Sequence, residues 1–302
     1  MLDYFIVDVF TEKEFDGAQI AVILLNTPLT DEQMQKLASE IGLSDCAFVE
    51  PAEGDQSFSL RVFTPSAERN FGGQATIAAA YVIAEQGLVS HEGDFTSLKF
   101  QQAAADVDVV LSKKNDEWFV QFSRKAEAVV DRFVPDNAAL AAALSLQESD
   151  IESIRFRPLL VACDQPYLVV PLRSFQAVRS AGFNFNEWSN RVASISPTNE
   201  ILLFTGKSDV ASSDFHARLL GPQLAPDADP PIASALPAFV GYLAELEELR
   251  EGTYAFSVDR GTVGTRKSLL NVELVHQSGR ENEVRVGGPA VLVAEGKIKI
   301  PA

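Results

Sequence analysis

Phe71-Gly72-Gly73-Gln74-Ala75-Thr76, followed by Ile77-Ala-Ala-Ala-Tyr81-Val-Ile-Ala84, is the stretch of sequence that decides the fold. Its second part is apolar on every side, which is typical of a helix enclosed by other elements and not of a helix on a surface. Glycine lets a backbone turn sharply and lets a ligand approach it closely. The stretch therefore predicts a small-residue turn that opens an enclosed helix at Gln74–Ala84.

A similar segment occurs in the second half of the chain. It reads Asp229-Pro-Pro-Ile-Ala-Ser234-Ala235-Leu-Pro-Ala-Phe-Val-Gly-Tyr-Leu-Ala244. Both segments have a small-residue turn, a polar residue, an alanine and then an apolar helix that contains a tyrosine. We therefore predict an internal duplication, with a second enclosed helix at Ser234–Leu246.

Strand patterns surround both segments and predict an α+β fold. Thr30 and Gln33 form a capping box for a helix that ends at Gly42, and a further helix is predicted at Asn137–Leu146. We assign residues 1–115 to an N-terminal half, to which residues 289–302 are expected to return, and residues 116–288 to a C-terminal half. The predicted strands are Tyr4–Phe10, Gln19–Leu24, Cys46–Val49, Phe58–Phe63, Ser97–Phe100, Val107–Leu111, Trp118–Phe122, Leu159–Val161, Tyr167–Val170, Glu200–Phe204, Tyr254–Val258, Ser268–Leu274, Glu283–Gly287 and Ala290–Glu295.

The composition of the chain excludes several classes of function. Its 302 residues carry 42 acidic and 25 basic side chains, a formal net charge of −17, and such a surface repels nucleic acid and anionic lipid. Two cysteines cannot build a disulfide framework, and the acidic first residues do not resemble a signal peptide. The charge-free stretches Asn70–Ala84 and Pro230–Ala244 are shorter than a membrane span. We therefore expect a soluble cytoplasmic protein that binds neither nucleic acid nor membrane.

Three familiar kinds of site are not supported by the sequence. His91, His216 and His276 lie far apart, and none has a cysteine or carboxylate at the spacing of metal ligands. No G-x-G-x-x-G follows the first strand, and Gly261–Gly264 is interpreted as a turn between late strands. No G-x-S-x-G nucleophile elbow occurs. We expect no metal and no dinucleotide cofactor.

The two small-residue turns are the first candidate site. Free N–H groups at the start of a helix form an electropositive cradle that suits a carboxylate. If the two halves face each other, Gln74 and Thr76 would lie across a cleft from Ser234. The alternative is that the glycines only make a tight turn and that Ser234 caps its helix.

Asp45 is the second candidate. It follows a capped helix and precedes an apolar strand, where desolvation would raise the pKa of a carboxyl group toward a proton-transfer role. The alternative is a turn aspartate that bonds its own backbone, and Asp229, which precedes Pro230, has the same alternative.

Several ordered motifs resemble one known family, the PhzF-type phenazine-biosynthesis-like isomerases, relatives in fold of diaminopimelate epimerase and proline racemase. The family pattern R-x-F-T-P…E-L-P-F-A-G-H-x-T is matched by Arg61–Pro65, Glu68 and Phe71–Thr76. The other matching segments are Asp8–Thr11 with Phe15–Gly17, Asp31–Met34, Leu43–Asp45, Asp214–Arg218 with Gly221-Pro222, and Asp229-Pro230 with Ser234-Ala235. The resemblance covers nearly the whole chain.

The resemblance implies two similar halves, each a curved sheet or open barrel around a central helix, with the active site in the cleft between them. It implies a homodimer and an isomerase that uses no cofactor and moves a proton on a small carboxylate-bearing substrate. Carried over by position, the catalytic glutamate falls on Asp45, the histidine on Gln74, the aspartate on Asp229 and the serine on Ser234. The implied substrate-binding residues are Gly72, Gly73, Ala75, Thr76 and Ala235.

The departures from the family pattern open a second hypothesis. Asp45 is one methylene shorter than glutamate, and Gln74 can donate a hydrogen bond but cannot carry a proton near neutral pH. Ile232-Ala233 replaces the pattern's Thr-Gly. The chain is therefore either an isomerase with Asp45 as base and then acid, or an altered relative that keeps the site for binding small molecules. A two-thiol racemase is disfavoured because neither turn contains cysteine, and Cys46 is interpreted as a buried strand residue.

Overall fold

Strands and helices of the chain form two units in the computed structural model. Unit 1 comprises Met1–Arg124, Gly264–Leu270 and Arg285–Ala302, and unit 2 comprises Lys125–Val263 and Asn271–Val284. The structure describes residues 1–90, 93–114, 117–196, 198–210, 213–224, 229–246, 249–261, 265–277 and 280–302. The expected boundary at residues 115 and 116, His91 and most of the turn at 261–264 therefore lie outside the described residues.

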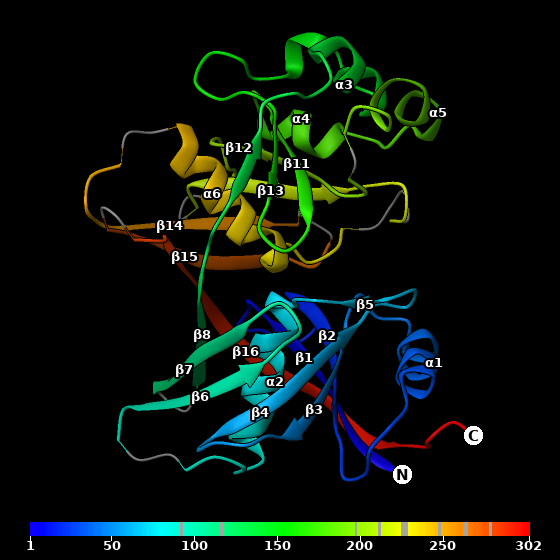
Figure 1. The fold of residues 1–302 in the computed structure, drawn as a ribbon, viewed down its shortest axis with the longest axis vertical. Helices are drawn as coiled ribbons and strands as arrows, with labels where there is room; N and C mark the ends of the chain where they lie inside the picture. Colours follow the sequence, from blue (N-terminus) through cyan, green and yellow to red (C-terminus); the bar gives the residue numbers. More distant parts are fainter. Residues whose placement is uncertain are drawn as a thin grey trace. The chain divides into compact units, whose positions relative to one another are not determined.

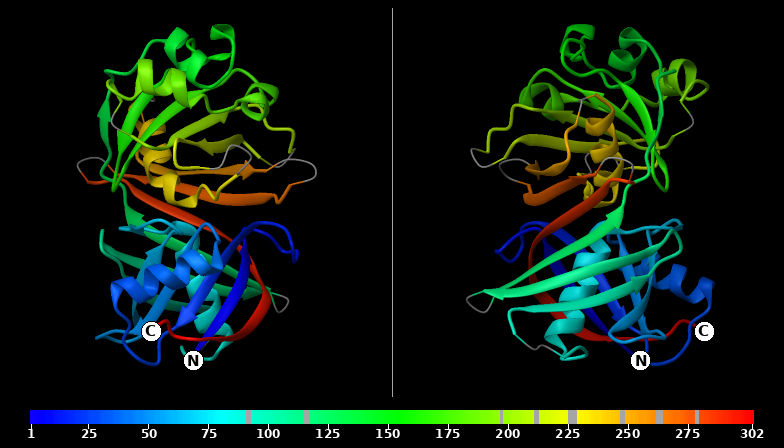
Figure 2. Two further views of the ribbon diagram at one scale, coloured as in Figure 1. Left: turned by 90° about the vertical axis from the view of Figure 1, so that its right-hand side faces the viewer. Right: turned by 60° about the vertical axis from the view of Figure 1, so that its left-hand side comes forward.

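Unit 1 is a closed barrel of eight strands (Figure 1). In order around the barrel, the strands are β1 (Leu2–Val9), β2 (Ala18–Leu24), β3 (Cys46–Pro51), β4 (Ser57–Phe63), β6 (Phe95–Gln101), β7 (Asp106–Lys114), β8 (Glu117–Lys125) and β16 (Glu283–Ile298). The barrel closes where β16 lies antiparallel beside β1, with Leu2 opposite Ile298 and Val9 opposite Ala290, red beside blue in Figure 2.

β16 corrects one prediction from the sequence. Two strands were expected at Glu283–Gly287 and Ala290–Glu295, but one continuous strand crosses the Gly-Gly-Pro between them. A Cβ atom on Gly288 would lie 2.7 Å from the ring of Phe10, and one on Gly287 would lie 2.9 Å from the ring of Phe119. These glycines admit neighbouring aromatic rings and do not turn the chain.

Helix α2 (Gly73–Glu85) is enclosed by unit 1, as predicted. Every residue from Gly73 to Ile83 is buried. The hydroxyl of Tyr81 accepts a hydrogen bond of 3.1 Å from the backbone N–H of Leu292 in β16. The run that is apolar on all sides thus correctly predicted an enclosed helix.

Helix α1 (Asp31–Ile41) links the parallel strands β2 and β3. Its predicted capping box is confirmed, because the Thr30 side chain accepts from the Gln33 N–H and the Gln33 side chain accepts from the Thr30 N–H. Gly42 ends the helix with a φ of +70°, the left-handed conformation that favours glycine.

Unit 2 has its own strands around a second enclosed helix, α6 (Leu236–Leu246), with Leu236 to Tyr242 buried. The helix was expected to begin at Ser234, but a 3-10 turn, η3 (Ala233–Ala235), precedes it. The strands, in their order in the sheet, are β15 (Ser268–His276), whose first residues belong to unit 1, β14 (Gly252–Arg260), β13 (Phe215–Leu220), β12 (Ile201–Thr205), β11 (Pro166–Pro171), β10 (Leu159–Ala162) and β9 (Val129–Asp131).

The strand pairings support the predicted duplication. β1–β2 are antiparallel, β2–β3 parallel, β3–β4 antiparallel and β4–β6 parallel. β10–β11, β11–β12, β12–β13 and β13–β14 repeat the same sequence of directions. The enclosed helix joins the last parallel pair in each unit, α2 between β4 and β6 and α6 between β13 and β14.

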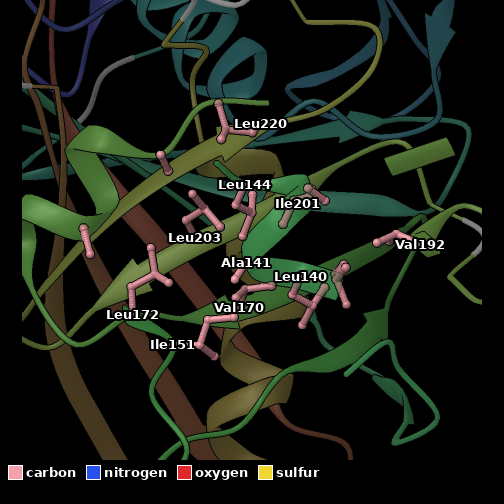
Figure 3. Packing of buried hydrophobic residues seen from close by; sticks show 14 of the residues in the cluster. Leu140, Ala141, Leu144, Ile151, Val170, Leu172, Val192, Ile201, Leu203 and Leu220 are labelled. Carbon is pink, nitrogen blue, oxygen red and sulfur yellow. The ribbon is translucent and has the colours of Figure 1, made fainter. Parts of the chain in front are cut away.

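Unit 2 also has short helices that the sequence analysis did not predict. They lie between β11 and β12, where unit 1 has α1 alone, and they pack on the sheet together with α3 (Asn137–Ala143). Figure 3 shows Leu140, Ala141 and Leu144 of this layer pointing toward strand residues such as Val170 and Leu203.

The predicted helix at Asn137–Leu146 ends earlier because Ser145 adopts a φ of +55°. The elements not predicted are α4 (Phe175–Ser180), α5 (Phe185–Glu187), η2 (Trp188–Val192), η1 (Glu148–Asp150), β9, β13 and β5 (Glu68–Arg69).

Candidate functional site

Asp45 is a buried carboxylate at the entrance to strand β3. Its side chain is 1% exposed, and its backbone carbonyl accepts a 3.2 Å hydrogen bond from Ala21 of β2. The side-chain amide Nε2 of Gln74, in the first turn of α2, donates to Asp45 Oδ2. The two residues are 29 positions apart in the sequence, and the structure brings them together as a hydrogen-bonded pair within unit 1.

Arg69 lies beside the other oxygen of the same carboxylate. Its Nε is 3.8 Å from Asp45 Oδ1, and its side chain is 21% exposed. Arg69 belongs to the short strand β5, which pairs with β4. β5 is further held by Glu68, whose two carboxylate oxygens each lie 2.7 Å from the guanidinium of Arg61. The sequence does not point to Arg69, because a lone arginine after a glutamate carries no signal for a site.

The turn at the start of α2 is held by its own hydrogen bonds. The Gly72 N–H donates to Gln102 Oε1 at 3.1 Å, and Gln102 Nε2 donates to the hydroxyl of Thr76 at 2.8 Å. That hydroxyl donates in turn to the Gly72 carbonyl at 2.7 Å. Gly72 and Thr76 therefore have a structural role in the turn, while Gly73 and Ala75 are buried in its first residues.

Gly72 is required by packing as well as by the turn. It is the N-cap of α2, and a Cβ atom at this position would lie 2.8 Å from Val62 Cγ2. Real Cβ atoms do not approach this closely, and Val62 is itself buried. Glycine at the cap thus lets the first turn of α2 lie directly on β4.

In unit 2, Asp229 lies four residues before η3. Its backbone carbonyl accepts from Nη1 of Arg260, and its buried Oδ1 has no hydrogen-bond partner among the described residues. Burial raises the pKa of Asp229 above its ordinary value, although the charges of Arg260, Arg218 and His216 partly offset this effect. Asp229 is therefore easier to protonate than an aspartate in water.

Ser234 and Ala235 follow in the same segment. Ser234 is the middle residue of η3 and is partly exposed, whereas Ala235 is fully buried. The N-cap of η3 is Ile232, a buried aliphatic residue. The two sets of candidate residues are thus described each within its own unit, Asp45 and Gln74 in unit 1 and Asp229 and Ser234 in unit 2.

Close to Asp229, a buried histidine pairs with a buried aspartate. His216 Nδ1 lies 2.7 Å from Asp259 Oδ2, and Ser208 Oγ donates to Asp259 Oδ1 at 2.5 Å. Burial raises the pKa of Asp259, but these two hydrogen bonds, together with the charge of His216 and a hydrogen bond from Ser213, outweigh burial and bring it below its ordinary value. His216 was considered only as a metal ligand in the sequence analysis. The pair depends on the register that places residue 216 of β13 opposite residue 259 of β14, and no local pattern reveals that register.

Cys46 is the buried strand residue that the sequence indicated. It is 1% exposed, carries a free thiol, and begins β3. Burial, together with the neighbouring charge of Asp45, raises the pKa of the thiol well above its ordinary value. The thiol therefore stays protonated, and a protonated thiol is a poor nucleophile.

Two features are absent from the described part of the chain. Within it, no group of three histidine, cysteine, aspartate or glutamate side chains is arranged to hold a metal ion. Among the same residues, no helix has the length and apolar character needed to cross a membrane.

Comparison with known proteins gives consistent matches over the whole chain. The family described as "Phenazine biosynthesis-like protein" matches residues 7–296. A curated protein of Mesorhizobium japonicum named "Uncharacterized isomerase" is 28% identical, over 99% of this chain and 99% of that protein.

Two solved structures are similar in fold. The crystal structure of a phenazine biosynthesis protein of the PhzF family from Bacillus anthracis matches with a TM-score of 0.85 at 20% identity, over 99% of both chains. A probable proline racemase from Agrobacterium radiobacter, solved with bound carbonate, matches with a TM-score of 0.66 at 13% identity, over 100% of this chain and 94% of that chain. The predicted α+β fold class and the predicted similarity in fold to proline racemase are thereby confirmed.

Proposed function

This chain belongs to the phenazine biosynthesis-like protein family, and on that premise we propose that it is an isomerase that moves a proton on a small carboxylate-bearing substrate. The observation that carries the proposal is the Asp45–Gln74 pair, a buried carboxylate beside the first turn of an enclosed helix. A carboxylate that is removed from water but hydrogen-bonded can accept a proton at a defined position.

The proposed reaction needs one group that takes a proton and returns it. Asp45, as base, removes a proton from a carbon atom of the substrate, and the electron pair of the broken C–H bond moves into the substrate's conjugated system. Asp45, now an acid, returns the proton to a different carbon, so that atoms and electrons balance within the substrate. Gln74 orients the carboxylate through Oδ2 but does not itself carry a proton.

The remaining candidates have supporting roles in this proposal. Asp229 and Ser234 contact the polar groups of the substrate. Backbone groups of Gly73, Ala75 and Ala235 contact the substrate near the starts of the two enclosed helices. That one substrate contacts residues of both sets stays a prediction, as do the homodimer, the cytoplasmic location and the independence from a cofactor.

Solvent deuterium tests the proposed chemistry. Small cyclic and aromatic carboxylates are incubated with the protein in D2O, and incorporation at carbon is followed by NMR. For a substrate found in this way, Asp45→Asn is expected to reduce incorporation by about 10²–10⁴-fold, because it removes the base and keeps the shape. Asp108→Asn is the matched control, since Asp108 is an exposed aspartate of unit 1 that pairs with Lys99. Undiminished incorporation in Asp45→Asn would remove the base from the proposal.

A second candidate function is binding without turnover. Two departures from the family pattern favour it. Gln74 stands where the pattern has histidine, and its amide donates a hydrogen bond to the carboxylate of Asp45. The buried Ile232 stands where the pattern has threonine. In this case, small carboxylates raise the melting temperature of both the wild type and Asp45→Asn, and neither protein incorporates deuterium. Gln74→His then tests whether a proton-carrying side chain at this position is enough to start exchange.

A further inference from the structure

The chain departs from the family pattern at Asp45 and at two residues that contact its carboxylate. The pattern has glutamate, leucine and histidine where this chain has Asp45, Arg69 and Gln74. The shorter acid stands between the other two residues, with Gln74 at Oδ2 and Arg69 at Oδ1. Each oxygen of the carboxylate therefore has its own polar neighbour.

Arg69 is itself placed by an anchored strand. Its backbone is fixed because β5 pairs with β4 and because Glu68 forms a two-point ion pair with Arg61. Arg61 also donates to Asp31 of α1 at 2.8 Å, so that the anchor reaches a second element. The backbone that carries the Arg69 guanidinium is therefore already fixed before a ligand binds.

We propose that Arg69 is a positioning residue that, together with Gln74, holds the side chain of Asp45 in one orientation as a charged carboxylate. The use of that carboxylate as a base rests on the function proposed above, but its orientation and charge do not. A buried carboxylate without a partner is costly, and an opposite charge within about 4–6 Å favours the ionised form. Cys46, the neighbouring titratable group, stays protonated and adds no charge.

The two neighbours compensate for the shorter side chain of Asp45. A glutamate reaches one methylene farther than an aspartate, and a misplacement of about 1 Å can reduce a rate by about 10²-fold. Two neighbours that hold the aspartate limit this loss of rate, because they keep its side chain in a single rotamer. Arg69 and Gln74 thus both offset the replacement of the family's glutamate by Asp45.

The decisive experiment needs no substrate. The protein is labelled with 13C in its aspartate carboxyl groups, and the Asp45 signal, assigned with Asp45→Asn, is followed against pH by NMR. We expect Arg69→Met to move the Asp45 titration upward by about one pH unit or more, and Arg69→Lys to keep at least half of the wild-type effect. Lys99→Met is the matched control: it removes one positive charge of unit 1 that pairs with Asp106 and Asp108, and is expected to shift the Asp45 signal by less than about 0.2 pH units.

Either an unchanged Asp45 titration in Arg69→Met, or equal shifts in Arg69→Met and Lys99→Met, would overturn the inference. If Arg69→Met does not fold, the 15N signal of Arg69 Nε is compared between wild type and Asp45→Asn; a moved signal supports the pair and an unmoved one overturns it. Because these measurements use no substrate, a protein that passes them but exchanges no deuterium would contradict the proposed function and leave the role of Arg69 standing.

Discussion

The two units share one topology, but they begin their enclosed helices differently. In unit 1, the cap is Gly72, which leaves room for Val62, and the α-helix starts at once. In unit 2, the N-cap residue is Ile232, whose buried side chain makes no capping hydrogen bond, and a 3-10 turn separates it from α6. The same pairing of strands therefore tolerates two ways of packing the start of the central helix.

The carboxylates beside the two helix starts differ even more. Asp45 has Gln74 and Arg69 at its two oxygens, whereas Asp229 has a buried Oδ1 without a hydrogen-bond partner among the described residues and a raised pKa. The parallel pair that flanks each helix differs as well. Residues Phe58 and Phe100 are opposite each other in unit 1, and His216 and Asp259 are opposite each other in unit 2. The duplicated fold thus repeats the directions of the strands and the helix that connects them. The polar side chains beside the helix differ between the two units.

Removing the charge from the unit 2 pair gives the largest expected effect. Asp259→Asn is expected to lower the free energy of unfolding by about 3 kcal/mol at pH 7, because it breaks a buried network with His216 and Ser208. The folded pKa of Asp259 is depressed, so its contribution is present above its unfolded value and is lost as the pH falls through the folded value. Urea unfolding at pH 7 and at pH 3 checks both expectations.

Phe58→Leu is the counterpart in unit 1. It changes an apolar pair whose ring centroids are 6.2 Å apart, so its cost should not depend on pH. Equal pH dependence in the two variants would break the comparison between the units.

Gly72→Ala tests the cap of unit 1, with an intermediate effect. The added methyl group meets Val62, and overpacking of this kind costs roughly 1–3 kcal/mol. Val62→Ala creates the missing space, so the double variant should lose less stability than the sum of the two single variants. Additive losses in chemical denaturation would show that the contact with Val62 is not the reason for the glycine.

Asp229→Asn gives the smallest expected effect and has the opposite sign. Because the folded pKa of Asp229 is raised, its stabilising contribution is complete below the unfolded value and is lost as the pH rises through the folded value. The asparagine variant should therefore be more stable than the wild type at pH 7.5 and no more stable at pH 3. A lower melting temperature at pH 7.5 would contradict the assignment of Asp229 as a carboxylate that burial destabilises.

The sequence predicts those features that depend on local pattern. The enclosed helices follow from runs that are apolar on all sides, and α1 follows from its capping box and Gly42. The candidate pair Asp45 and Gln74 follows from the family motifs, and only the hydrogen bond between them required the structure.

The missed features depend on residues that are distant in the sequence. Arg69 reaches Asp45 only because β5 folds back on β4, and His216 meets Asp259 only through the register of β13 and β14. The glycines within β16 look like a turn in the sequence, because the rings of Phe10 and Phe119 that require them are more than a hundred residues away. A pattern read along the chain does not contain such contacts.

Strand β16 has a consequence for the order in which the protein becomes complete during synthesis. Unit 2 contains no residue after Val284, whereas the barrel of unit 1 closes only when residues 290–298 pair with β1. Until β16 has left the ribosome, β1, β8 and β15 each lack their β16 neighbour and present a bare backbone edge, and such edges pair readily with other chains. The strands of unit 1 that precede unit 2 in the chain are therefore completed only after unit 2 has been translated, and their open edges are exposed to other chains in the meantime.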